Sequence, residues 1–156
     1  MCWHHSPMLK RPARDADGPR SSSPPPMTSL TTRQLAAAPD AIAPDGSEVR
    51  LLASVARGSM AHFTLAPGAV TRAVAHKTVE EVWFFVGGRG RVWRRLGGEE
   101  LTIGVFPGMS IAIPTGAAFQ FRADGDEPLE IVGVTMPPWP GETEAYPVEG
   151  IWPPTI

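Results

Sequence analysis

Cysteine, long apolar runs and net charge are all scarce in this chain of 156 residues. Cys2 is its only cysteine, which excludes a disulfide framework and a cluster of thiolate metal ligands. No apolar run approaches the roughly 18 residues that cross a bilayer, and the first residues lack the apolar stretch of a signal peptide. We therefore expect a cytoplasmic protein that does not contact a membrane.

The formal net charge of −2 argues against a strongly basic nucleic-acid-binding protein. Arginines do gather between residues 89 and 95, with Trp93 among them, and a basic groove with an aromatic side chain can bind RNA. However, Glu99 and Glu100 follow where the next strand of a hairpin would place cross-strand partners for these arginines. We expect outward-facing arginines and no nucleic-acid partner.

Proline and glycine are abundant, with 18 and 16 residues respectively, and they separate short apolar runs. Frequent breakers between short runs favour β architecture over long helices. Residues 1–26 lack periodicity, so we expect a disordered tail there, and Met27 is a candidate start of the natural protein. Residues 27–156 form the predicted domain, whose Pro-rich segment from residue 137 is expected to wrap around it with aromatic anchors.

Nine short segments with apolar alternation, spaced about ten residues apart, predict a β-sandwich or a β-barrel. They cover residues 48–55, 59–66, 70–76, 80–87, 91–96, 99–105, 110–113, 117–123 and 128–136. Residues 31–38 precede them and are expected to form one or two helical turns.

The segment from residue 67 to residue 90 is the most specific part of the sequence. It resembles the first motif of the cupin family, in which a Gly is followed by His-x-His, three or four residues, a Glu, six residues and a Gly. Gly88 aligns with the last position, Glu81 with the acidic position and His76 with the second histidine. Val74 stands at the position of the first histidine.

Residues 107–119 are similar to the second cupin motif, which runs Gly, five residues, Pro-x-Gly, two residues and His. Gly108 and Pro114 are in register, and Phe119 stands at the histidine position. The resemblance covers residues 48–136 and implies an all-β fold, the double-stranded β-helix or jelly-roll barrel. It also implies a small-molecule ligand inside the barrel and the pairing of two copies as a homodimer.

Cupins that bind a transition metal typically hold it through three histidines and one glutamate, and only His76 and Glu81 remain here. The two replaced histidine positions carry apolar side chains without a donor atom. His62 remains available as a third ligand, whereas alternation turns Gln120 away from the motif face. We therefore expect either no cofactor or one divalent metal ion held by His76, Glu81 and His62.

Strand alternation groups the side chains that would face the interior of the barrel. The inward sets are Arg72, Val74 and His76; Glu81, Trp83 and Phe85; and Phe119 and Phe121. They predict a pocket that binds a largely apolar or aromatic organic molecule through a few polar anchors. Trp83 and Phe119 fit equally well as ordinary core residues, since a small barrel must be filled.

A carboxylate beside an imidazole fixes its tautomer and raises its basicity, so His76 and Glu81 are the candidate catalytic pair. Arg72 would hold a carboxylate or enolate oxygen of the substrate. These roles predict metal-independent isomerisation, elimination (a lyase reaction) or cyclisation. Three alternatives stay open: a metal-dependent oxygenase or isomerase, a non-catalytic binding module, and a His–Glu pair that is only a remnant of a metal pocket.

Overall fold

The computed structural model describes residues 29–156, so the tail predicted at residues 1–26 lies outside the described residues. The described part of the chain forms strands and no helix, and therefore no helix long and apolar enough to cross a membrane. The strands are β1 (Ala41–Ile42), β2 (Glu48–Val55), β3 (Gly58–Leu65), β4 (Val74–His76), β5 (Glu80–Gly87), β6 (Arg89–Leu96), β7 (Glu99–Val105), β8 (Ser110–Ile113), β9 (Ala118–Asp124), β10 (Leu129–Met136) and β11 (Ala145–Pro147).

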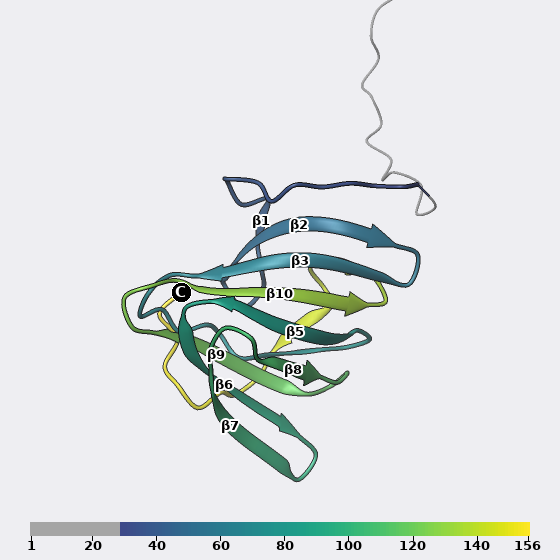
Figure 1. Cartoon of the computed structure of the whole chain (residues 1–156). Coiled ribbons are helices and arrows are strands. Elements are labelled where there is room, and N and C mark those ends of the chain that lie inside the picture. Colours follow the sequence, from purple (N-terminus) through teal and green to yellow (C-terminus); the bar gives the residue numbers. More distant parts are fainter. Residues whose placement is uncertain (1–28) are drawn as a thin grey trace, which may run out of the picture.

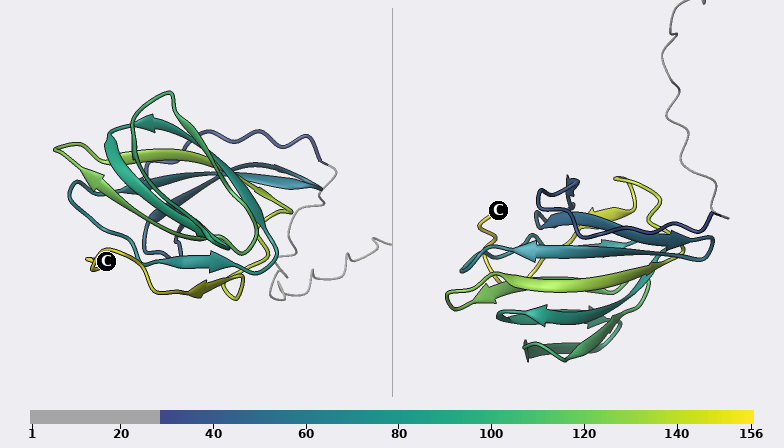
Figure 2. Two further views of the ribbon diagram at one scale, coloured as in Figure 1. Left: turned by 90° about the horizontal axis from the view of Figure 1, so that it is seen from below. Right: turned by 45° about the horizontal axis from the view of Figure 1, so that its top comes forward.

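The strands form two antiparallel sheets that face each other across the interior (Figure 1, Figure 2). One sheet has the order β1-β2-β3-β10-β5-β8, and the other has the order β11-β4-β9-β6-β7. Strands distant in sequence are neighbours, since β10 pairs with β3 and β5, and β9 pairs with β4 and β6. This architecture is a double-stranded β-helix, and the predicted all-β barrel is confirmed.

The helical turns predicted at residues 31–38 are wrong. This segment has no regular structure, and every residue in it is exposed. A short helix that packs no face against the rest of the protein is not stable in water. The Arg50 side chain instead holds the segment by donating hydrogen bonds to the carbonyl oxygens of Ala36 and Ala37, each over 3.0 Å.

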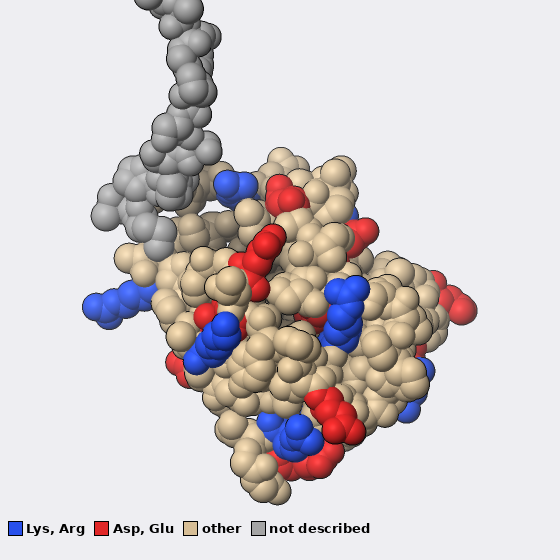
Figure 3. All heavy atoms as spheres, turned by 180° about the vertical axis from the view of Figure 1, so that it is seen from behind, with Lys and Arg blue, Asp and Glu red and all other residues tan. Residues whose placement is uncertain are grey.

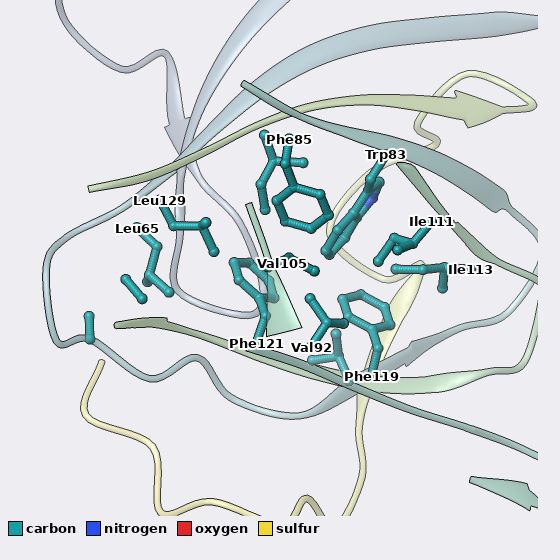
Figure 4. Close-up of a cluster of buried hydrophobic side chains, with 14 of the residues drawn as sticks. Leu65, Trp83, Phe85, Val92, Val105, Ile111, Ile113, Phe119, Phe121 and Leu129 are labelled. Carbon is teal, nitrogen blue, oxygen red and sulfur yellow. The ribbon is translucent and has the colours of Figure 1, made fainter. Parts of the chain in front are cut away.

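One end of the barrel, which we call the closed end, is filled by apolar side chains from both sheets. Its members are at most 2% exposed and include Leu65, Phe85, Val92, Phe121, Leu129 and Ile131. In Figure 4, Phe85 and Phe121 lie with Leu65 and Leu129, whereas Trp83 and Phe119 lie toward Ile113. The burial of these side chains is the main source of stability that the fold offers.

The segment after β10 returns along the five-stranded sheet, where β11 pairs with β4. The buried side chain of Gln120 in β9 fastens the end of this segment. Its amide nitrogen donates to the carbonyl oxygens of Thr71 and Trp152 (2.8 Å each), and its oxygen accepts from the backbone N–H groups of Ile151 and Trp152 (3.0 Å each). The Pro-rich segment thus lies against the five-stranded sheet, and Gln120 holds its end.

Charged side chains of both signs are mixed on the face shown in Figure 3, without one continuous basic surface. The arginines of β6 are exposed or half-buried, and Arg91 pairs with Asp124 (2.9 Å). Arg95 lies over the Trp93 ring, and the Trp93 indole N–H donates to Glu100 over 2.7 Å. Glu100 lies opposite Arg95 across the hairpin, as expected, and its carboxylate also accepts the hydrogen bond from the tryptophan.

Candidate functional site

The opposite end of the barrel, which we call the cavity end, encloses a cavity of about 450 Å³. This volume is within the range of small-molecule sites in proteins. Strands of both sheets, residues 41–45 and the segment after β10 form its wall. The aromatic and polar side chains of the wall are Phe63, Trp83, Phe119 and Trp139, and Asp45, Ser59, His76, Glu81, Thr135 and Glu142.

His76 and Glu81 meet at this cavity from neighbouring positions at the end of β4 and the start of β5. Both side chains are buried, at 5% and 4% exposure, and His76 Nδ1 lies 3.8 Å from Glu81 Oε1. Glu81 Oε2 accepts a hydrogen bond from the Trp83 indole N–H. His76 Nδ1 is buried and has no hydrogen-bond partner within residues 29–156. The imidazole therefore offers one nitrogen that the folded chain leaves unused.

Burial shifts the pKa values of this pair in opposite directions because both groups are more easily buried in the neutral form. It lowers the pKa of His76 to about 4, although the nearby Glu144 carboxylate acts in the other direction. It raises the pKa of Glu81 to about 7, against the effect of the Trp83 hydrogen bond and in the same direction as the charge of Asp45. Near neutral pH, His76 is an uncharged base and Glu81 is partly an uncharged acid.

Glu144, from the segment after β10, holds the turn between His76 and Glu81. Its carboxylate accepts hydrogen bonds from the backbone N–H groups of Thr78 (2.6 Å) and Val79 (2.7 Å) and from the Thr78 hydroxyl (2.9 Å). Burial raises the pKa of Glu144, but these hydrogen bonds and the nearby His76 outweigh it, so the pKa lies below its ordinary value. Glu144 thus keeps a negative charge close to His76.

Aromatic rings surround the imidazole. The centroid of the His76 ring lies 5.2 Å from that of Phe119 and 5.1 Å from that of Trp139, and both pairs are edge-to-face. Trp139 is held in place by its backbone N–H, which donates to the Ser59 hydroxyl over 3.1 Å. The Trp83 ring stands edge-to-face to Phe119 at 5.4 Å. These rings lower the local polarity, which is the cause of the pKa shifts of the pair.

Asp45 contributes a third buried ionisable group to the cavity wall, at 6% exposure. Its Oδ1 atom accepts hydrogen bonds from the Ser47 backbone N–H (2.8 Å) and the Ser47 hydroxyl (2.7 Å). Burial raises the pKa of Asp45, against the effects of these hydrogen bonds and of the charge of Arg72.

The structure places the predicted binding residues in three different environments. Val74, Trp83 and Phe119 line the cavity with His76 and Glu81. Phe85 and Phe121 share their inward face but lie deeper, in the closed end, so they do not line the cavity.

Arg72 is exposed and lies outside the cavity wall, contrary to expectation. The reason is that the strand predicted over residues 70–76 is regular only in β4, and Val70 makes a single bridge, to Arg122. Alternation counted back from His76 therefore does not extend to residue 72.

His62, the expected third metal ligand, is not near the pair. It lies opposite Val132, on the outer face of the six-stranded sheet, and its Nε2 is 3.6 Å from Glu130 Oε1. Residues 29–156 hold no group of three or more His, Cys, Asp or Glu side chains arranged for a metal ion. The donor set of the cavity thus does not fit a cupin metal centre, because the side chains at the two replaced histidine positions cannot coordinate.

Sequence reasoning missed Asp45, Trp139 and Glu144. None of them belongs to a strand with alternation, and two of them lie in the Pro-rich segment after β10. The one available signal was the clustering of aromatic residues in that segment, which indicated anchoring and gave no position relative to the cavity.

Comparisons with known proteins agree with this architecture. A family model described as a cupin domain matches residues 61–135. The chain is similar to BH2720 from Bacillus halodurans, with 22% identity and a TM-score of 0.54 over 60% of this chain and 73% of that chain. It is also similar to an uncharacterised conserved protein with a double-stranded β-helix domain from Klebsiella pneumoniae, with 15% identity and a TM-score of 0.54 over 67% and 85% of the two chains.

A third similar structure is a variant of oxalate decarboxylase from Bacillus subtilis, with 18% identity and a TM-score of 0.57. The match covers 66% of this chain but spans only 28% of the decarboxylase chain. A search of curated proteins found no match. At these identities the likeness concerns the fold alone.

Proposed function

Because this chain is a member of the cupin superfamily, we propose that its barrel cavity binds a small, largely apolar or aromatic organic molecule and catalyses proton transfer on it through His76 and Glu81. The reaction class is metal-independent isomerisation, elimination or cyclisation. The observation that carries the proposal is the pair itself: an unpartnered imidazole nitrogen faces a buried carboxyl group inside a mostly aromatic cavity.

The protonation states of the pair supply one base and one acid near neutral pH. Neutral His76 has a lone pair that takes a proton from a carbon next to a carbonyl group. The protonated form of Glu81 donates its proton to the carbonyl oxygen, and an enol results. In an isomerisation Glu81 then takes back the oxygen-bound proton while His76 returns its proton to a different carbon, so both side chains recover their starting states.

The distance within the pair favours separate roles on one ligand. At 3.8 Å, His76 Nδ1 and Glu81 Oε1 are too far apart for a strong direct hydrogen bond. A ligand atom that lies on the cavity side of the pair, about 2.8 Å from each atom, would contact both groups. The largely apolar wall lowers the polarity of this space, which strengthens the electrostatic effect of each group on the bound molecule.

The test is turnover of a ligand that is identified by its binding to the purified protein. His76→Ala and Glu81→Gln are each expected to reduce kcat by roughly 100-fold or more, the usual contribution of a general acid or base. The control is Glu80→Gln, which changes an exposed neighbour on the outer face of β5 and should leave kcat unchanged. The catalytic part of the proposal is wrong if both cavity variants retain full turnover, or if the bound ligand is never converted.

Metal analysis separates this mechanism from a metal-dependent one. Protein treated with a chelator and dialysed is expected to keep its turnover. Loss of turnover that is restored by one added divalent metal, together with loss of that metal in His76→Ala, would contradict the proposal.

The homodimer implied by the resemblance stays a prediction. The outer face of β5 presents Val82, Phe84 and Val86, which are 46%, 48% and 43% exposed. Val132 and Val134 of the neighbouring strand β10 lie opposite Phe84 and Val82. We propose this face as the contact between two copies, and light scattering of Phe84→Lys against the unaltered chain tests it: the variant should have half the mass.

A further inference from the structure

Asp45 is a buried carboxyl group in the cavity wall that the proposed proton transfer does not use. A tight turn fixes its position, since the Ala43 N–H donates to the Ser47 carbonyl oxygen (2.8 Å) and the Arg72 N–H donates to the Asp45 carbonyl oxygen (2.9 Å). Both hydrogen bonds that Ser47 donates, one from its backbone N–H and one from its hydroxyl, go to Oδ1. In the described part of the chain, Oδ2 accepts none and is left for another donor.

The charges around the cavity are of one sign. Asp45, Glu81 and Glu142 line it, and no lysine or arginine among residues 29–156 does so. Glu144 lies behind His76, and His76 itself is uncharged near neutral pH because burial lowers its pKa to about 4. The charge of Arg72 acts on Asp45 from outside the cavity wall. An anionic ligand would therefore meet carboxyl groups with no cation in the described part of the wall to pair with, which is costly at low polarity.

The aromatic wall favours the opposite charge. Phe63, Trp83, Phe119 and Trp139 line the same cavity, and the faces of such rings attract cations. The distances between ring centroids are 6.3 Å for Phe63 and Trp83 and 5.4 Å for Trp83 and Phe119, so the rings form one continuous wall. Carboxyl groups combined with aromatic rings are the chemistry that recognises an organic ammonium group.

Resting on the proposed function of the cavity as a ligand site, we propose that the ligand is a protonated amine with an aromatic or aliphatic body. Its ammonium group donates a hydrogen bond to Asp45 Oδ2, and its body packs against Trp83 and Phe119. The reacting part of the molecule then extends toward His76 and Glu81. A bound cation also balances the charge of Asp45, which otherwise opposes the ionisation of Glu81.

The test uses three probes of similar size and different charge: 2-phenylethylamine, 2-phenylethanol and phenylacetate at pH 7.5. Titrations are followed by NMR at the indole N–H signals of Trp83 and Trp139, which line the cavity and report affinities down to the millimolar range. The amine is expected to bind at least ten-fold more tightly than the alcohol, and phenylacetate more weakly than both.

Asp45→Asn should reduce the affinity for the amine at least ten-fold and leave that for the alcohol unchanged, since asparagine can still accept the Ser47 hydrogen bonds. Asp126→Asn changes an exposed carboxylate outside the cavity and serves as the control. Equal or tighter binding of the alcohol or of phenylacetate overturns the amine assignment and leaves cavity binding intact. Failure of all three probes to bind overturns both the amine assignment and ligand binding in the cavity. An unaltered affinity of Asp45→Asn for the amine shows that Asp45 does not contact the ammonium group.

Discussion

The closed end and the cavity end of the barrel share strands β3, β5, β9 and β10, but the side chains change in size along them. The inward residues of β10 run from Leu129 and Ile131 to Gly133 and Thr135. Those of β3, which pair with them one by one, run from Leu65 and Phe63 to Ala61 and Ser59. Both strands therefore taper from large to small side chains in the same direction, and the space left by the small ones is the cavity.

The two ends also differ in how they treat polar groups. The closed end holds no ionisable side chain among its buried members, whereas the cavity end buries His76, Glu81 and Asp45. Burying such groups opposes folding unless they are neutral or paired. The closed end thus provides the stability that allows the cavity end to hold groups in unfavourable surroundings.

The largest expected effect comes from removing a buried side chain from the closed end. Phe85→Ala should reduce the free energy of unfolding by about 3–5 kcal/mol, because Phe85 is completely buried and its removal leaves a void. Urea denaturation at pH 7 measures this loss. Phe63→Ala is the matched change at the cavity end, and it should cost less because this ring already borders empty space. Equal losses would show that the two ends are packed alike.

The next effect separates the two ionisable groups of the cavity end by their pH dependence. The pKa of Glu81 is raised from its ordinary 4.5 to about 7, so Glu81 lowers stability as pH rises between these values. The pKa of His76 is lowered from 6.5 to about 4, so His76 raises stability as pH rises between these values. In the unaltered protein the two opposite changes of stability with pH cancel over most of the pH range in which both occur.

A variant that lacks one of the two groups loses that group's pH dependence of stability, so the pH dependence due to the other group can be measured. In Glu81→Gln, stability should rise by about 3 kcal/mol from pH 4 to pH 6.5, and in His76→Ala it should fall by a similar amount from pH 4.5 to pH 7. Urea denaturation across this pH range measures both curves. Two flat curves would mean that neither group has a perturbed pKa in the folded protein.

The smallest effect comes from adding one methyl group where the taper begins. A Cβ atom at Gly133 would lie 2.9 Å from Phe63 Cε2 and 3.2 Å from Trp83 Cδ1. Gly133→Ala should therefore cost about 1–3 kcal/mol and shift the Trp83 fluorescence. Gly104→Ala adds the same group where no atom lies within 4 Å, so it should cost clearly less. If the two variants are equally stable, the contact at position 133 is not limiting.

Most of the barrel was predictable because its strands alternate and its two motifs have fixed spacing. Alternation correctly grouped Val74, Trp83 and Phe119 on the inner face. It could not give depth along the barrel, which is why Phe85 was assigned to the pocket. Because side chains alternate with a period of two, the face of His62 depends on a pairing register that only the structure supplies.

The remaining parts of the site come from segments without periodicity. Asp45 lies in a turn, and Trp139 and Glu144 lie in the segment after β10. Their positions follow from long-range hydrogen bonds, such as those of Glu144 to Thr78 and Val79, and no local pattern in the sequence encodes them.

Trp139, Glu142 and Ala145 all reach the cavity from one continuous stretch that follows β10, outside the region matched by the cupin model. Part of the cavity wall is therefore modular: an exchange of this stretch between related barrels would alter the lining of the cavity while every strand pairing of the six-stranded sheet stayed in place. The end of β10 is a natural boundary for grafting experiments, and Glu144 would have to be retained in each graft so that the turn between His76 and Glu81 keeps its shape.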